Sequence, residues 1–285
     1  MKGHLYAFII LFSISAASCK KDDAQPQNNV RTELSVNNEA YGTDAQQKMD
    51  YYLPANRTDT GTKVMILIHG GGWSAGDKTD FNNFMADIKT YFPGWAIFNI
   101  NYRLAAGNSN LFPTQELDVR AAAEYIFNNA GQFHISGKFV LVGASAGAHL
   151  ALLQGNKNHN LPVKAIVNFF GPTDITDMYN NPLSALIPPA IEAVVGATPT
   201  SNPNLYFQSS PINFVTAQSP PTISLQGGMD PLVNPAQQLA LKAKLDASSV
   251  INEYVFYPNE AHGWVGASMT DSYNRIKTFI TANVQ

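Results

Sequence analysis

Ser145 stands at the centre of Gly-Ala-Ser-Ala-Gly, residues 143–147, a spacing that suits an exposed nucleophile. An apolar run at residues 140–142 precedes it, and an apolar helical pattern follows it. This order predicts a strand, a sharp turn and a helix, in which the turn exposes the serine hydroxyl above the end of a sheet. The two glycines suit a turn where strand and helix backbones come too close for a Cβ atom. Because such a pentapeptide also arises by chance, its weight depends on partner residues elsewhere.

Two later residues could activate this serine. A serine hydroxyl needs a histidine to take its proton, and the histidine needs a carboxylate to fix its tautomer. His262 follows a predicted strand at residues 252–257, and Asp230 follows the preceding predicted strand at residues 222–226. Both therefore lie at the carboxyl ends of strands, where catalytic groups gather in open α/β sheets. We predict that Ser145 is the nucleophile, His262 the base and Asp230 the carboxylate that orients it.

A glycine-rich loop supplies candidate oxyanion donors. His-Gly-Gly-Gly-Trp, residues 69–73, follows a buried strand predicted at residues 64–68. Bare backbone N–H groups in such a loop can approach a substrate carbonyl. Alone, the motif fits a phosphate-binding or simple tight turn equally well; the serine motif some 70 residues later favours an oxyanion hole. We predict that the N–H groups of Gly71, Gly72 and Ala146 form it.

Other residues near these loops have two possible roles. Trp73 and Trp264 each flank a catalytic loop, and one or both wall a substrate pocket or pack in the core. His149, one turn into the helix after Ser145, is expected to be a packed, hydrogen-bonded histidine rather than a second base. Glu260 is expected to be solvated or to bond its own loop.

The composition excludes several classes of protein. The chain has 285 residues, of which 45% are hydrophobic and 14% charged, which suits one large α/β core. A net charge of -3 lacks the basic excess of a nucleic-acid binder. The six histidines never fall at metal-ligand spacing, and a single cysteine cannot form a disulfide framework. We therefore expect a small-molecule or glycan substrate and neither a metal nor a cofactor.

Predicted strands alternate with predicted helices, so the sheet is expected to be mostly parallel and covered on both faces. Between residues 174 and 219 the periodicity is lost in proline-rich sequence, which predicts a short cap or lid insertion rather than a second domain. The predicted strands are an edge strand at 47–53 and further strands at 64–68, 95–100, 139–142, 165–170, 222–226 and 252–257; the predicted helices are 80–91, 114–130, 146 onward, 235–245 and 270 onward.

The first residues resemble a bacterial lipoprotein signal. Lys2 precedes an apolar run at residues 5–12, and small residues lead up to Cys19. The run is too short to span a bilayer. The resemblance implies a signal peptide over residues 1–18, a lipidated Cys19 as membrane anchor, and export to the periplasm or the cell surface. A polar tether would occupy residues 19–31, and the catalytic domain residues 32–285.

From about residue 47 to the C-terminus, the sequence resembles the α/β-hydrolase superfamily, and within it bacterial carboxylesterases related to hormone-sensitive lipase, acetyl-xylan or feruloyl esterases and kynurenine formamidase. The chain order Ser145, Asp230, His262 is the order of that fold. Asp174 also follows a predicted strand and is the alternative candidate for the triad carboxylate, but the resemblance implies a structural role for it. The motifs that carry it are residues 69–73, 101–104, 143–150, 171–174, 210–212, 227–233 and 261–263.

The resemblance implies an α/β-hydrolase fold and a secreted serine carboxylesterase, acting through a Ser-His-Asp triad and an acyl-enzyme. Ala144 and His149 depart from the lipase-like relatives and favour the polysaccharide-esterase and formamidase branches. The expected substrates are short-acyl or aromatic esters on carbohydrates. An amide hydrolase, either an arylformamidase or an exopeptidase, would use the same triad. A non-catalytic binding protein is the remaining alternative, although such proteins typically lack a triad member.

Overall fold

One sheet of eight strands forms the centre of the computed structural model, which describes residues 1, 31–157 and 160–285. The strand order is β1-β2-β4-β3-β5-β6-β7-β8. β2 is antiparallel to both neighbours, and all other pairs are parallel, which confirms the mostly parallel sheet. The strands are β1 Leu34–Ala40, β2 Lys48–Leu53, β3 Val64–Ile68, β4 Ala96–Ile100, β5 Phe139–Ala144, β6 Val163–Phe169, β7 Thr222–Gly227 and β8 Asn252–Tyr257.

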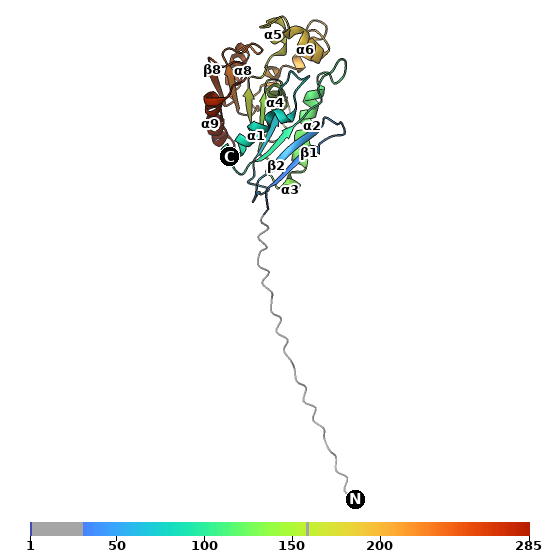
Figure 1. The fold of residues 1–285 in the computed structure, drawn as a ribbon, viewed down its shortest axis with the longest axis vertical. Coiled ribbons are helices and arrows are strands. Elements are labelled where there is room, and N and C mark those ends of the chain that lie inside the picture. Colours follow the sequence, from blue (N-terminus) through green and yellow to red (C-terminus); the bar gives the residue numbers. More distant parts are fainter. Residues whose placement is uncertain (2–30, 158–159) are drawn as a thin grey trace. The chain divides into compact units, whose positions relative to one another are not determined.

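Helices cover both faces of this sheet (Figure 1). Met65 and Leu67 of β3 pack with α1 and α9 on one face, whereas Ile66 and Ile68 pack with α2, α4 and α8 on the other. The helices are η1 Lys78–Phe81, α1 Asn82–Tyr91, α2 Thr114–Asn128, α3 Ala130–Phe133, α4 Ala146–Lys157, α5 Ile175–Asn180, α6 Ile187–Val195, α7 Pro203–Gln208, η2 Pro211–Phe214, α8 Ala236–Ala247 and α9 Gly266–Asn283.

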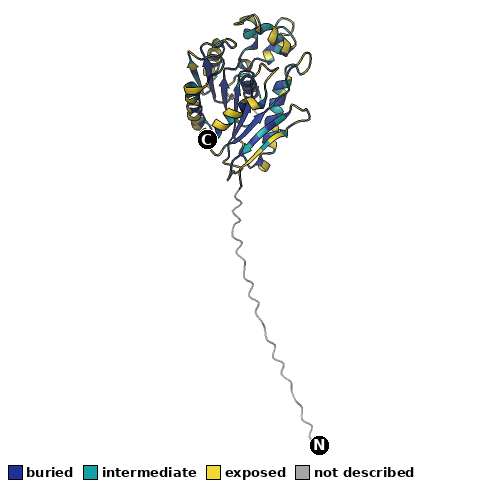
Figure 2. Cartoon of the chain, in the orientation of Figure 1, coloured by how far each residue is buried: buried dark blue, intermediate teal, exposed yellow. Residues whose placement is uncertain are grey.

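The central strands are buried along their whole length, as a sheet with two covered faces requires. Every residue of β3, β4 and β7 is buried. Figure 2 shows this as dark strands between helices whose outer surfaces are exposed. The sheet is therefore a rigid base for the loops that leave its carboxyl edge.

The edge-strand prediction for residues 47–53 is wrong. β2 lies between β1 and β4, and β1 forms the edge. Five of the seven residues of β1 are exposed, so this strand has no apolar pattern by which to recognise it. Residues 174–219, expected to be an insertion, contain α5, α6, α7 and η2, and α5 and α6 lie together at the top of Figure 1.

Residues Arg31–Gln285 form one compact unit. Apart from Met1 and Arg31, the expected signal peptide, Cys19 and the tether lie outside the described residues. Within the described part of the chain, no helix is both long and apolar enough to cross a membrane.

Candidate active site

Ser145 occupies a strained turn between β5 and α4. Its φ angle is +53°, in the left-handed region that side chains other than glycine rarely adopt. A Cβ on Gly143 would lie 2.3 Å from the carbonyl oxygen of Gly147, and one on Gly147 would lie 2.0 Å from that of Ile68. Both positions therefore require glycine. The Ser145 N–H donates to the Phe169 carbonyl at 2.9 Å, which fixes the turn against β6.

The predicted histidine and carboxylate meet this serine in one chain of hydrogen bonds. His262 Nε2 lies 2.8 Å from Ser145 Oγ, and His262 Nδ1 lies 2.7 Å from Asp230 Oδ2. A carboxylate that accepts the Nδ1 proton leaves Nε2 free to accept the serine proton. The arrangement can therefore deprotonate Ser145 as it attacks.

The loops after β7 and β8 hold each other in place. A Cβ on Gly227 would lie 2.2 Å from the Ala261 carbonyl oxygen, so the two loops touch backbone to backbone. The Met229 N–H donates to the Glu260 carbonyl at 2.9 Å. Glu260 itself accepts a hydrogen bond from the Ser268 hydroxyl.

The carboxylate of Asp230 is buried and fully bonded. Oδ1 accepts from the N–H groups of Leu232 and Val233 at 2.8 and 2.9 Å, and Oδ2 also accepts from Gln226 Nε2 at 3.0 Å. Burial alone would raise the pKa of Asp230, but the hydrogen bonds from His262 and from these N–H groups lower it below its usual value. The group therefore stays an anion, as stabilisation of a cationic imidazole requires.

The glycine-rich loop after β3 lies directly beside the nucleophile. A Cβ on Gly70 would lie 3.3 Å from the Cβ of Ser145. Gly71 has φ +106°, and a Cβ there would lie 2.1 Å from the Ala75 carbonyl oxygen. Among the described residues, the N–H groups of Gly71 and Gly72 meet no acceptor. The N–H of Ala146 opens α4, where a helix leaves such groups unpaired.

Tyr102 braces this loop from below. Its hydroxyl lies 3.0 Å from the carbonyl oxygen of His69 and 3.2 Å from that of Gly70, and its ring stacks on His69 with centroids 4.3 Å apart. Burial lowers the pKa of His69, whose Nε2 has no partner among the described residues. Both rings are buried, so the loop rests on a fixed support.

A second buried contact connects the loop to the region of residues 174–219. Trp73 Nε1 donates to His149 Nδ1 at 3.1 Å, and His149 Nε2 donates to the Ser209 carbonyl at 2.6 Å. His149 is therefore a packed, hydrogen-bonded side chain of α4, and it has no contact with the proton chain described above. Burial lowers its pKa to about 4.

This histidine should make the fold sensitive to acid. Its folded-state pKa lies below the unfolded value of 6.5, so between these values the unfolded chain binds a proton that the folded chain does not. We expect the free energy of unfolding to fall as the pH drops from 6.5 towards 4, by at most about 3 kcal/mol. Denaturant unfolding at several pH values measures this effect. His149→Gln should flatten that part of the profile; an unchanged slope would contradict the assignment.

The two predicted pocket tryptophans have different surroundings. Trp264 lines a cavity of about 520 Å³, and its Nε1 donates to Ser272 Oγ at 2.9 Å. Trp73 faces only a narrow apolar gap of about 10 Å³ beneath α6. Its ring is 8% exposed. Of the pair, only Trp264 borders a space large enough for a ligand.

The remaining candidates lie away from the proton chain. Asp174 caps the N-terminus of α5 by accepting the Asp177 N–H at 3.0 Å. Asp118 is buried on α2 and accepts two hydrogen bonds from the Arg103 guanidinium. Within residues 31–157 and 160–285, no cluster of three or more His, Cys, Asp or Glu side chains could hold a metal ion.

Two residues at the site were not anticipated. The ring of Phe170 packs on His262 with centroids 4.6 Å apart and has φ +44°, which no pattern in the sequence indicates. Gln226 is the next-to-last residue of the buried strand β7, and its Nε2 donates to Asp230 Oδ2.

Comparison with known proteins identifies relatives. Residues 49–245 match the family model described as BD-FAE. The chain is 28% identical over 215 residues to esterase LipQ of Mycobacterium tuberculosis, covering 70% of this chain and 50% of LipQ. It spans about half the length of the named relatives that it matches.

Solved structures share the fold. A bifunctional GH43-CE protein of Bacteroides eggerthii has a TM-score of 0.76 at 27% identity, covering 87% of this chain and 38% of that chain. A structure titled bacterial heroin esterase has a TM-score of 0.71 at 23% identity, covering 89% of this chain and 84% of that chain. Together with the strand order, these neighbours confirm the α/β-hydrolase fold.

Proposed function

Because the chain belongs to the BD-FAE family, we propose that it is a serine carboxylesterase that hydrolyses short-acyl or aromatic esters of carbohydrates. One observation carries the proposal: Asp230, His262 and Ser145 form a continuous chain of hydrogen bonds beside a glycine loop in which the Gly71 and Gly72 N–H groups meet no acceptor within the described part of the chain. The name of LipQ, an esterase, supports the same reaction.

The proposed reaction has two steps. Ser145 Oγ attacks the ester carbonyl carbon while His262 Nε2 takes the hydroxyl proton, and the N–H groups of Gly71, Gly72 and Ala146 hold the oxyanion. Collapse breaks the bond to the alcohol oxygen, which takes the proton from His262. Water then attacks the acyl-enzyme by the same path, releasing the acid and free Ser145. Asp230 stabilises the imidazolium throughout.

The carbohydrate part of the proposal has two supports. The structural neighbour from Bacteroides eggerthii is titled a bifunctional GH43-CE protein. The lipoprotein-like first residues suit an exported enzyme, for which glycans outside the cell are accessible substrates. We further propose that residues 174–219 act as a cap beside the site.

Two assays test the function. A fluorophosphonate probe should form an adduct on Ser145 in the folded protein, and the protein should release acetate or an aromatic acid from an acylated glycan. Failure to label Ser145 would favour a non-catalytic binding protein. Faster cleavage of an arylformamide or an aminoacyl anilide than of matched esters would favour an amide hydrolase. Cleavage of aryl esters without release from any acylated glycan would remove only the carbohydrate part.

The proposed anchor makes a separate prediction. Cells that express the full chain should incorporate labelled fatty acid into it, and the protein should sediment with membranes. Cys19→Ser should abolish both, because the cysteine thiol is the acylated group and stable anchoring needs about two membrane signals. Equal labelling of the Cys19→Ser variant would contradict the anchor without affecting the esterase proposal.

A further inference from the structure

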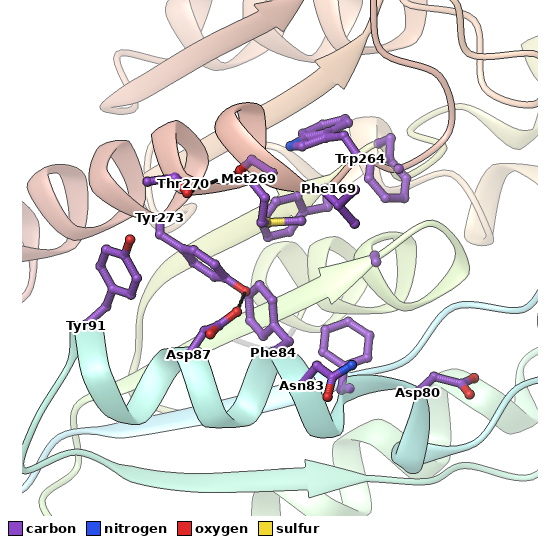
Figure 3. A pocket seen from close by; sticks show the side chains of 16 residues that line it. Asp80, Asn83, Phe84, Asp87, Tyr91, Phe169, Trp264, Met269, Thr270 and Tyr273 are labelled. Carbon is purple, nitrogen blue, oxygen red and sulfur yellow. Dashed lines mark hydrogen bonds between the residues drawn. The ribbon is translucent and has the colours of Figure 1, made fainter.

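A cavity of about 520 Å³ lies between α1 and α9 on one face of the sheet. Figure 3 shows Phe84 and Asp87 of α1 facing Met269 and Tyr273 of α9. Ligand pockets usually enclose about 300–1,000 Å³, so this cavity can hold a ring-sized group.

The cavity lies beside the catalytic residues; Ser145, His262 and Asp230 do not line it, but the neighbours of Ser145 and His262 do. Gly263, which lines it, directly follows His262, and Ala144 directly precedes Ser145. Phe170 also lines it, and the ring of Phe170 packs against the imidazole of His262. A group held against Phe170 or Gly263 would therefore lie close to His262.

Aromatic rings form much of the wall. The half-buried ring of Phe84 contacts Tyr273 and Phe169, with centroids 5.3 and 5.7 Å apart. Tyr91 packs on Tyr273 at 4.8 Å, and Trp264 closes the end near the histidine. Rigid rings of this kind offer flat apolar surface with little loss of side-chain entropy on binding.

The charged residues of the wall are both acidic. Asp80 and Asp87 are exposed at the cavity, and none of its lining residues is Lys, Arg or His. The Tyr273 hydroxyl donates to Asp87 Oδ2 at 2.8 Å, and Oδ1 meets no other partner among the described residues. Carboxylate oxygens accept hydrogen bonds from hydroxyl groups, and they repel an anion.

We propose that this cavity binds the leaving alcohol of the ester, and that this alcohol is a neutral sugar. The inference rests on the proposed esterase function and deepens it. When the acyl–oxygen bond breaks, His262 Nε2 must reach the departing oxygen, so the alcohol must lie close to the imidazole, and the neighbouring cavity can receive the rest of the alcohol. The proton moves from Ser145 through His262 to the sugar oxygen, and the acyl group stays on Ser145. Aromatic faces suit the apolar face of a sugar ring, and the two carboxylates suit its hydroxyl groups.

The rate at which the acyl-enzyme is hydrolysed distinguishes a subsite for the alcohol from a pocket for the acyl group. Once the alcohol has left, hydrolysis of the acyl-enzyme no longer involves the cavity. Variants of the cavity should therefore slow acylation by sugar esters and leave deacylation unchanged. A bound sugar should also compete with water for the acyl-enzyme, so that a neutral methyl glycoside yields a transfer product.

Phe84→Ala and Asp87→Asn test the assignment, with Phe127→Ala on α2 as a control, because Phe127 is an exposed phenylalanine that does not line the cavity. Asp87→Asn keeps the size of the side chain. We expect Phe84→Ala to lower kcat/KM for an acetylated methyl xyloside about ten-fold, and to leave kcat/KM for ethyl acetate unchanged. Transfer to methyl xyloside should fall in parallel. Asp87→Asn should increase the relative activity on an acetylated uronic acid.

Deacylation is followed after a burst of 4-nitrophenol from 4-nitrophenyl acetate. Slower deacylation in the cavity variants would assign the cavity to the acyl group and overturn the inference, as would equal losses on both esters or no loss on either. The wild-type adduct at Ser145 does not depend on these variants. If wild type labels and hydrolyses esters but the variants show no selectivity for the alcohol, only this inference fails.

Discussion

Ser145→Ala should abolish turnover of 4-nitrophenyl acetate, lowering kcat by several powers of ten, about 10⁶ by comparison with serine enzymes in which the nucleophile has been removed. The variant lacks the oxygen that forms the acyl-enzyme, so only the oxyanion donors and substrate binding remain. The backbone should survive the change, because the Ser145 N–H keeps its bond to Phe169 and alanine fits the same turn as serine. Steady-state kinetics and a thermal melt measure the two effects separately.

Ser136→Ala is the matched control. Ser136 is buried, and its hydroxyl donates to the Thr62 carbonyl at 2.9 Å; it precedes β5, whereas Ser145 follows the other end of that strand. That variant should lose about 1 kcal/mol of stability with unchanged kcat. Nearly full activity of Ser145→Ala, in a folded protein free of wild-type contamination, would mean that the nucleophile is misassigned.

The sheet was predictable because its strands are buried on both faces. Such strands are short and rich in apolar residues, and β3, β5 and β7 are predicted from the sequence within about two residues of their observed ends. β1 lacks such a run, since it pairs with only one neighbour and exposes most of its side chains. Without β1, β2 was assigned to the edge of the sheet.

The packing of α2 was not predictable from its pattern. Leu117 is apolar yet 42% exposed, and the buried face of α2 holds Val119, Ala122 and Ile126. That face also carries Asp118, which is buried because Arg103 and Gln47 bond its carboxylate. A charged residue is normally expected on the exposed face of a helix, so the burial of Asp118 becomes clear only from the tertiary structure, which supplies its partners.

The catalytic loops could be predicted from the sequence because each follows a predicted strand and carries a residue of suitable chemistry. The cavity could not be predicted from the sequence. Its walls come from α1, from the end of β6 and from α9, segments that are separated by about eighty to a hundred residues each. The position of the Phe170 ring depends in addition on a positive φ angle, which the sequence does not indicate. Motifs therefore predict the chemistry of this site, whereas the shape of its pocket depends on contacts between distant segments.

Asp230→Asn should lower kcat by about 10⁴, the loss measured when the equivalent carboxylate of a serine protease triad becomes an amide. The asparagine amide keeps the volume of the side chain but removes the charge that stabilises the imidazolium. An NH₂ group facing His262 Nδ1 would also donate to that nitrogen, so that the imidazole proton would lie on Nε2. A protonated Nε2 cannot accept the proton of Ser145. The asparagine Oδ1 can still accept hydrogen bonds from the N–H groups of Leu232 and Val233, so the loop should keep its shape. The loss should therefore appear in kcat, with the melting temperature little changed.

Asp174→Asn separates this assignment from its rival. Asp174 follows β6, as a triad acid could, but it caps α5, and asparagine caps a helix about as well as aspartate does. We therefore expect kcat of Asp174→Asn to stay within a factor of about two of wild type. A larger loss in Asp174→Asn than in Asp230→Asn would transfer the role of the acid to the loop after β6. Since His262 Nδ1 lies 2.7 Å from Asp230, that result would require His262 to leave its observed partner before it could act as a base.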